Sequence, residues 1–108
     1  MHKTFALVKT QGALNAQNKA SDAAGDQHNT AVGYHAGVAV SEAVDNTLIG
    51  SIAGDSLNTG GNNTAVGKQA LSADTKGGTA VAIGQLALGA QNFTDAMDNY
   101  NVAIGFGA

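Results

Sequence analysis

The chain has 108 residues, which fits one small domain, and it lacks cysteine, which excludes disulfides and cysteine-based zinc sites. Its net charge is −3, and its five basic residues are scattered lysines, so a nucleic-acid-binding stripe and a basic membrane-binding face are both missing. No apolar stretch approaches the length of a membrane span. We therefore expect no nucleic-acid partner and no insertion into a membrane.

Residues 1–28 are predicted to hold a degenerate first coil and a long connection. The run "FALVKTQGALNAQN" at 5–18 aligns with "TAVAIGQLALGAQN" at 79–92. This alignment places Ala6 in the column of Ala80 and Thr10 in the column of Gly84. The polar segment that follows, over 19–28, is predicted to connect this coil to the next.

Residues 29–108 repeat one short motif five times. Each copy ends in a glycine anchor, at Gly33, Gly50, Gly67, Gly84 and Gly105, with intervals of 17, 17, 17 and 21 residues. Three residues after each anchor stands an alanine: Ala36, Ala53, Ala70, Ala87 and Ala108. Four residues before it stands an asparagine in four copies, Asn29, Asn46, Asn63 and Asn101, with Ala80 as the exception. Columns kept at a fixed spacing indicate a repeat architecture.

A short strand is predicted just before each anchor. Aliphatic β-branched residues occupy alternate positions there: Val32, Ile49, Val66, Val81, Ile83, Val102 and Ile104. This alternation is typical of strands, whereas a helix would need glycine and β-branched residues in its interior. We predict that these side chains face inward and that each glycine ends its strand. Thr30, Thr47 and Thr64 share the column of Val81 and Val102.

The predicted fold is all-β, a parallel β-solenoid of about six coils. Stacked coils bring equivalent residues within about 4.8 Å of each other. Asparagine suits the turns of such a stack, because it tolerates left-handed backbone geometry and its amide can bond along the stack. The variable segments between the motifs are rich in polar residues and are predicted to form the outer turns.

The motifs "NTAVGYHAG", "GNNTAVGKQAL", "TAVAIGQLALGAQN" and "YNVAIGFGA" resemble the head repeats of trimeric autotransporter adhesins. They resemble equally the "NTAVG" repeats of phage tail-fibre shafts. The resemblance is good over residues 29–108 and weak over 5–18, and it rests on the "AVG" or "AIG" strands and the alanine that follows them. It implies a left-handed parallel β-roll, three chains around a common axis, and surface attachment without catalysis. The period here is longer than in most adhesin heads, so larger outer loops are expected.

No cofactor, metal or catalytic residue is predicted. His28 and His35 flank one coil, and in a trimer one histidine from each chain could converge on a metal ion. No other coil repeats them, so we interpret them as solvated side chains. The aspartates do not form the single column that calcium-binding solenoids use, and no serine stands in a recognisable catalytic setting.

The sequence therefore predicts a non-enzymatic structural or adhesive module of an extracellular fibre, at a cell surface or on a virion. Its expected partners are further copies of itself, as a homotrimer, and an unidentified cell-surface or matrix receptor. One alternative is a filament subunit that stacks head to tail. Another is an ice-binding solenoid, which an outward threonine column would favour. An acyltransferase on a left-handed β-helix is disfavoured, since it needs a six-residue period and a catalytic histidine.

The two ends of the sequence carry a further expectation. The last coil stops at Ala108, and the first coil has Thr10 in place of its anchor glycine. Uncapped coils expose backbone donors and acceptors to any similar edge. We expect either a piece of a longer fibre or a subunit that stacks head to tail.

Overall fold

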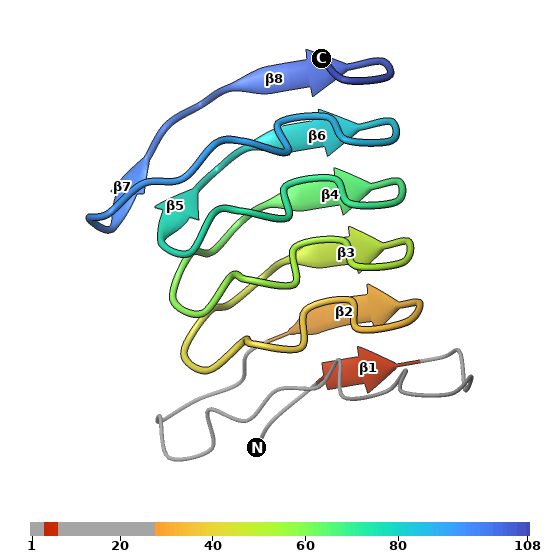
Figure 1. Cartoon of the computed structure of the whole chain (residues 1–108). Helices are drawn as coiled ribbons and strands as arrows, with labels where there is room; N and C mark the ends of the chain where they lie inside the picture. Colours follow the sequence, from red (N-terminus) through yellow and green to blue (C-terminus); the bar gives the residue numbers. More distant parts are fainter. Residues whose placement is uncertain (1–3, 7–27) are drawn as a thin grey trace.

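The computed structural model describes residues 4–6 and 28–108 (Figure 1). Within them the chain forms strands and turns, and no helix: β1 (Thr4–Ala6), β2 (Asn29–Val32), β3 (Thr47–Ile49), β4 (Thr64–Val66), β5 (Gly77–Gly78), β6 (Val81–Ile83), β7 (Met97–Asp98) and β8 (Val102–Ile104). The strands lie one above another, and each coil returns in front of them before it reaches the next strand (Figure 1). The prediction of an all-β solenoid is confirmed, with about four turns described.

One parallel sheet runs through the whole stack in the order β1-β2-β3-β4-β6-β8. Its register pairs Thr30 with Thr47, Thr47 with Thr64, and Thr64 with Val81. Each of these steps is one 17-residue period, so the sequence columns coincide with the hydrogen-bonded columns of the sheet. A second sheet joins β5 to β7, pairing Gly77 with Met97, at the wide outer loops.

The first strand pairs in a register different from the one predicted. Thr4 lies opposite Asn29, and Ala6 lies opposite Ala31. The alignment with residues 79–92 places Ala6 in the column of Asn29, so that prediction is wrong by two residues. An even shift keeps each residue on the same face of the sheet, which is why the periodic pattern does not reveal it. Thr10 and the connection over 19–27 lie outside the described residues.

The interior of the solenoid is a thin layer of small side chains. From β2, β3, β4 and β6, the buried side chains are those of Ala31, Leu48, Ala65 and Ala82. From the turns and the return run, the buried side chains are Ala36, Val40, Ala53, Leu57, Ala70, Leu71 and Ala87. The largest fully buried apolar side chains are leucines, so the sheet and the return run pack close together.

The β-branched residues predicted to be inward lie on the outside of the sheet. Ile49 and Ile83 are 38% and 36% exposed, and Val102 and Ile104 are each 67% exposed. Val32, Val66 and Val81 are partly exposed as well. The inward assignment of these seven residues is therefore wrong. The physical reason is that neighbouring residues of a strand face opposite sides, and the interior is filled by the residues between them, which are alanine in β2, β4 and β6 and leucine in β3.

The glycine anchors end their strands in a backbone conformation that other residues avoid. Their φ angles lie between +125° and +136°. A Cβ atom built on Gly33 would lie 2.7 Å from the carbonyl oxygen of Gly50, and one on Gly50 would lie 2.6 Å from that of Gly67. Glycine is therefore required both by the backbone angle and by the close approach of the next coil.

Candidate functional site

The asparagine column forms a buried ladder of amides along the stack. The Oδ1 atom of Asn29 accepts a hydrogen bond from the backbone N–H of Asn46 (3.0 Å), and that of Asn46 accepts one from Asn63 (2.9 Å). The Nδ2 groups of Asn29, Asn46 and Asn63 each donate to the carbonyl oxygen of a residue on the opposite side of the coil. Both ends of each amide are satisfied, so these side chains hold the coils together and are not free to bind a ligand.

The ladder changes where the repeat becomes longer. Asn63 still accepts from the backbone N–H of Ala80 (2.9 Å), but Ala80 has no amide to offer to the next coil. Asn101 is exposed; its Nδ2 donates to Oε1 of Gln91 (2.7 Å), and its backbone N–H donates to Oδ1 of Asn99 (2.9 Å). The terminal alanine, Ala108, is exposed too. The last copy of the motif therefore keeps the sequence pattern without the buried ladder.

Asp74 has a structural role that was not predicted from the sequence. It is fully buried, and its Oδ1 atom accepts hydrogen bonds from the backbone N–H groups of Gly77 and Phe93, both at 3.0 Å. Its Oδ2 atom accepts one from Nε2 of Gln91 (2.7 Å). In the preceding coils its column holds Leu57 and Val40. The change in this column from the aliphatic Val40 and Leu57 to the polar Asp74 and Gln91 is the signal that could have identified this clamp.

The two histidines of the described region lie near separate acidic residues. Nδ1 of His28 lies 3.5 Å from Oδ1 of Asp45, and both side chains are about half exposed. The ring of His35 stacks on that of Tyr34, with centroids 4.1 Å apart. Burial raises the pKa of Asp55, while a backbone hydrogen bond and the charge of His35 oppose that rise. Across residues 4–6 and 28–108 there is no group of three or more histidine, cysteine or acidic side chains that could hold a metal ion.

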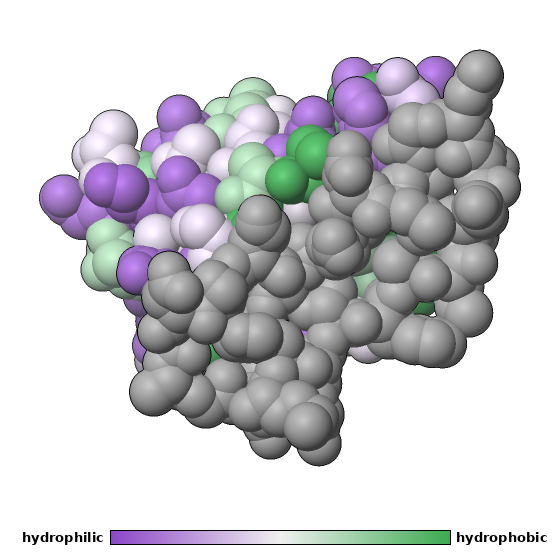
Figure 2. Space-filling model, turned by 90° about the horizontal axis from the view of Figure 1, so that it is seen from below, coloured by the Kyte–Doolittle hydropathy of each residue, from purple (hydrophilic) through white to green (hydrophobic). Residues whose placement is uncertain are grey.

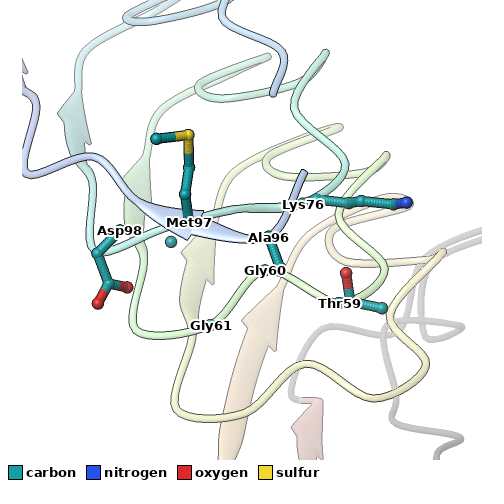
Figure 3. A pocket seen from close by; sticks show the side chains of 8 residues that line it. Thr59, Gly60, Gly61, Lys76, Ala96, Met97 and Asp98 are labelled. Carbon is teal, nitrogen blue, oxygen red and sulfur yellow. The ribbon is translucent and has the colours of Figure 1, made fainter. Parts of the chain in front are cut away.

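A shallow hollow lies between three stacked outer loops (Figure 3). Its volume is about 260 Å³, and its lining consists of Thr59, Gly60, Gly61, Lys76, Gly78, Ala96, Met97 and Asp98. The charged groups of Lys76 and Asp98 point away from each other (Figure 3), and Asp98 accepts a hydrogen bond from Oγ1 of Thr79 (2.7 Å). A Cβ atom built on Gly60, Gly61 or Gly78 would lie within 2.9 Å of the backbone of a neighbouring coil.

The outward face of the six-stranded sheet is the strongest candidate for a functional surface. We call it the outer face; it consists of two rows of side chains, Thr30, Thr47, Thr64, Val81 and Val102 in one, and Val32, Ile49, Val66, Ile83 and Ile104 in the other. Exposed rows of β-branched residues on a regular sheet are typical of a contact surface. Figure 2 views the stack from below, along its axis and not onto the outer face, and shows hydrophilic and hydrophobic residues side by side in its coloured part.

A scan against known protein families finds no matching family model, a search of curated proteins finds no match, and a search of solved structures finds none either. In the described part of the chain, no helix has the length and apolarity needed to cross a membrane.

Proposed function

We propose that the chain is a non-enzymatic structural module of an extracellular fibre, a left-handed solenoid of six coils that acts as a homotrimer. The observation that carries this proposal is the outer face. Its second row is entirely valine and isoleucine, and Ile49 and Ile83 remain more than one third exposed although coils cover them on both sides. In a homotrimer these rows pack against the same rows of two other chains.

Energetics support such an association. The interior of one chain is built mainly from alanine, which contributes little burial per residue. Fully burying a valine or isoleucine side chain contributes about 1.5–3 kcal/mol, and the exposed part of each outer-face residue contributes a share of that. Several such residues per chain, repeated over three chains, add apolar burial that a thin solenoid lacks on its own.

The architecture also suits a fibre that attaches to a surface. Stacked coils transmit load along their axis through backbone hydrogen bonds, and each coil needs only its neighbours for stability. The outer turns vary in sequence from coil to coil, over 38–45, 55–62, 72–78 and 93–100. In the proposed module these loops face a receptor on a cell or matrix, while the repeated columns hold the scaffold.

The test compares two charge insertions at neighbouring positions. Ile83→Asp places a carboxylate on the outer face, whereas Gln85→Asp places one on the turn just beyond the anchor Gly84. We expect the parent chain and Gln85→Asp to have the mass of a trimer in analytical ultracentrifugation, and Ile83→Asp to dissociate. A parent chain that stays a folded monomer at all concentrations would contradict the proposal.

Ice binding is the second candidate function, and the position of the threonines favours it. Thr30, Thr47 and Thr64 lie on the outer face in one register, with strands about 4.8 Å apart. An inward threonine column would count against this function, and the structure places the column outward instead. If the outer face binds ice, thermal hysteresis will be present in the parent chain and lost in Thr47→Lys. A trimer that buries the face predicts no hysteresis in either chain.

A further inference from the structure

Two further columns of side chains border the outer face. The start column lies two residues before the row that begins with Thr30, and it contains His28, Asp45, Asn62 and Thr79. The end column lies two residues after the row that begins with Val32, and it contains Tyr34, Ser51, Lys68 and Gln85. Because all strands of the sheet run in one direction (Figure 1), the start column borders the outer face along one side and the end column along the other.

Backbone hydrogen bonds keep both columns in register with the stack. The N–H of Asn62 donates to the carbonyl oxygen of Val44, and the N–H of Gln69 donates to that of Ser51, both at 2.9 Å. Successive members of a column are therefore one coil apart, about 4.8 Å along the stack. Asp45 and Lys68 both belong to coils that have a described coil on either side, so their exposure does not arise from an end of the stack.

The two columns carry opposite charges. Asp45 is the acid of the start column, and Lys68 is the base of the end column. The side chain of Asp45 remains half exposed although Nδ1 of His28 lies 3.5 Å from its Oδ1 atom, so the carboxylate is open to a further partner. Lys68 is exposed on the turn just beyond the anchor Gly67. A strand and its anchor separate the two columns, so the two charges do not meet within one chain.

The symmetry of an assembly decides which columns meet. When copies are related by rotation about an axis parallel to the stack, with their outer faces turned inward, the start column of each copy lies beside the end column of the next. The copies then stand at the same height, and Asp45 of one copy and Lys68 of the next differ by one coil along the axis, about 4.8 Å, which a lysine side chain spans. In an antiparallel arrangement each column instead meets the same column of the other copy.

We propose that Asp45 of one copy forms an ion pair with Lys68 of the next copy, and that this pair selects the parallel arrangement of the chains. The partner is thus a second copy of the same chain. This inference rests on the proposed homotrimer, because it requires outer faces that pack together. The apolar rows contribute burial in either orientation, whereas antiparallel packing leaves both charges unpaired beside an apolar contact and is disfavoured for that reason.

The repeat itself supplies substitutions that remove each charge with little change in shape. Asp45→Asn gives this position the residue type of Asn62 in the same column, and Lys68→Gln follows Gln85. Asparagine also tolerates the positive φ of Asp45, which is +58°. The association of the parent chain, the two single variants and the double variant is measured by sedimentation equilibrium.

A double-mutant cycle of these chains tests the ion pair. We expect each single variant to weaken the association about tenfold, because a ring of three loses three exposed pairs at once. The double variant should be weaker than either single variant by no more than about threefold, since the second substitution removes a partner that is already unpaired. Lys76→Gln is the matched control, because it removes a lysine that is exposed on an outer loop, and it should leave the association unchanged.

The outcomes separate this inference from the proposed trimer. A parent trimer in which the losses of the two single variants multiply in the double variant would overturn the ion pair and leave the trimer standing. Equal weakening by Lys76→Gln would show an effect of net charge and would overturn the ion pair as well. A parent chain that stays monomeric would overturn both proposals.

Crosslinking tests the orientation of the chains while both charges stay in place. The parent chain has no cysteine, so Ser51→Cys, Asn62→Cys and the chain with both substitutions are treated with a short bismaleimide linker. Position 51 lies in the end column and position 62 in the start column, one coil apart like Lys68 and Asp45. We expect covalent trimers from the chain with both cysteines and little product from either single variant at the same concentration. Equal yields from a single variant, or no product from the chain with both cysteines, would overturn the parallel arrangement.

Discussion

The two halves of the described stack close their coils by different chemistry. In the lower half, from Asn29 to Asn63, a buried asparagine side chain of one coil accepts a hydrogen bond from the backbone of the next coil. In the upper half, from Asp74 onward, the Asp74 carboxylate accepts hydrogen bonds from Gly77, Phe93 and Gln91, and Gln91 in turn accepts one from Asn101. The strand register is continuous across both halves. The sheet therefore needs its small inward residues and glycine anchors everywhere, whereas the polar groups that tie the outer loop can be exchanged.

The exchange coincides with the longer loop. The interval from Gly84 to Gly105 is 21 residues, and the equivalent of Asn63 in this coil is Ala80. Without an amide at Ala80, the next coil gains its polar contacts from Asp74 and Gln91, which occupy the column of Val40 and Leu57. The coils with the longer loop therefore have two hydrogen-bonded polar side chains, Asp74 and Gln91, where the earlier coils have the apolar Val40 and Leu57.

The largest effect on stability is expected from substitution of a glycine anchor, because both halves of the stack contain these anchors. Gly67→Ala places a Cβ atom 2.6 Å from the backbone of Gly84 and imposes a φ of +136° on alanine. We expect a loss of more than about 3 kcal/mol in the free energy of unfolding, seen as failure to fold or a much lower melting temperature.

The matched control for this prediction is Gly107→Ala. Gly107 also has a positive φ, of +67°, but a Cβ atom at this position would meet no atom within 4 Å. We expect a loss of about 1 kcal/mol, from backbone strain alone. Equal melting temperatures of the two variants would show that the close approach of neighbouring coils is not the reason why the anchor positions require glycine.

The amide ladder should make the lower half more sensitive than the upper half. Asn46→Ala removes the acceptor for the N–H of Asn63 and the donor for the carbonyl of Gly60, and leaves both buried groups unpaired. We expect a loss of about 2–4 kcal/mol. Asn101→Ala, in the same column but exposed, should cost less than about 1 kcal/mol. Chemical denaturation of both variants measures the difference, and a larger loss for Asn101→Ala would refute the assignment.

The carboxylate clamp of the upper half gives an intermediate effect. Asp74→Asn preserves the shape of the side chain and the acceptor for Gly77 and Phe93, but turns an amide N–H₂ toward the amide of Gln91. Gln91 must then reverse its own amide and lose its acceptor for Asn101. We expect a loss of about 1–2 kcal/mol and faster amide hydrogen exchange at Phe93. Unchanged exchange at Phe93 would show that the carboxylate does not hold this loop.

Much of the fold could be predicted from the sequence because it depends on residues that repeat. The glycine column demands a special backbone angle, and the 17-residue spacing sets the register. The orientation of the strands could not be predicted in the same way. Both alternating sets are apolar, with Ala or Leu in one and Val or Ile in the other, so hydrophobicity does not decide which faces inward. Volume favours the observed orientation in the alanine-containing coils, since the thin interior accepts Ala31 and Ala65 more readily than Val32 and Val66. In β3 it does not discriminate, because the inward Leu48 is as large as the outward Ile49.

The features that occur once were the hardest to predict. Asp74 is the one aspartate in its column, and its partners Gln91 and Phe93 are 17 and 19 residues away in the sequence. The first strand likewise has only a weak copy of the motif, and its register differs by two residues from the alignment. Repetition supplies several independent observations of one geometry, and a single substitution supplies none.

The smallest expected effect is a pH dependence in the lower half. Burial raises the pKa of Asp55 above its ordinary value of 3.8, so the folded chain binds this proton more tightly than the unfolded chain does. Below the unfolded pKa the group is protonated in both states and costs no stability. As the pH rises through the pKa of the folded state, the Asp55 carboxyl group must lose its proton in a partly buried position, and the contribution of this group to the stability of the chain falls. Asp55→Asn removes this contribution, so the stability of the parent chain relative to Asp55→Asn should decrease in chemical denaturation as the pH rises from below 3.8 through the raised pKa of the folded state. A relative stability that instead increases over this range would mean that the hydrogen bond and the charge of His35 outweigh burial.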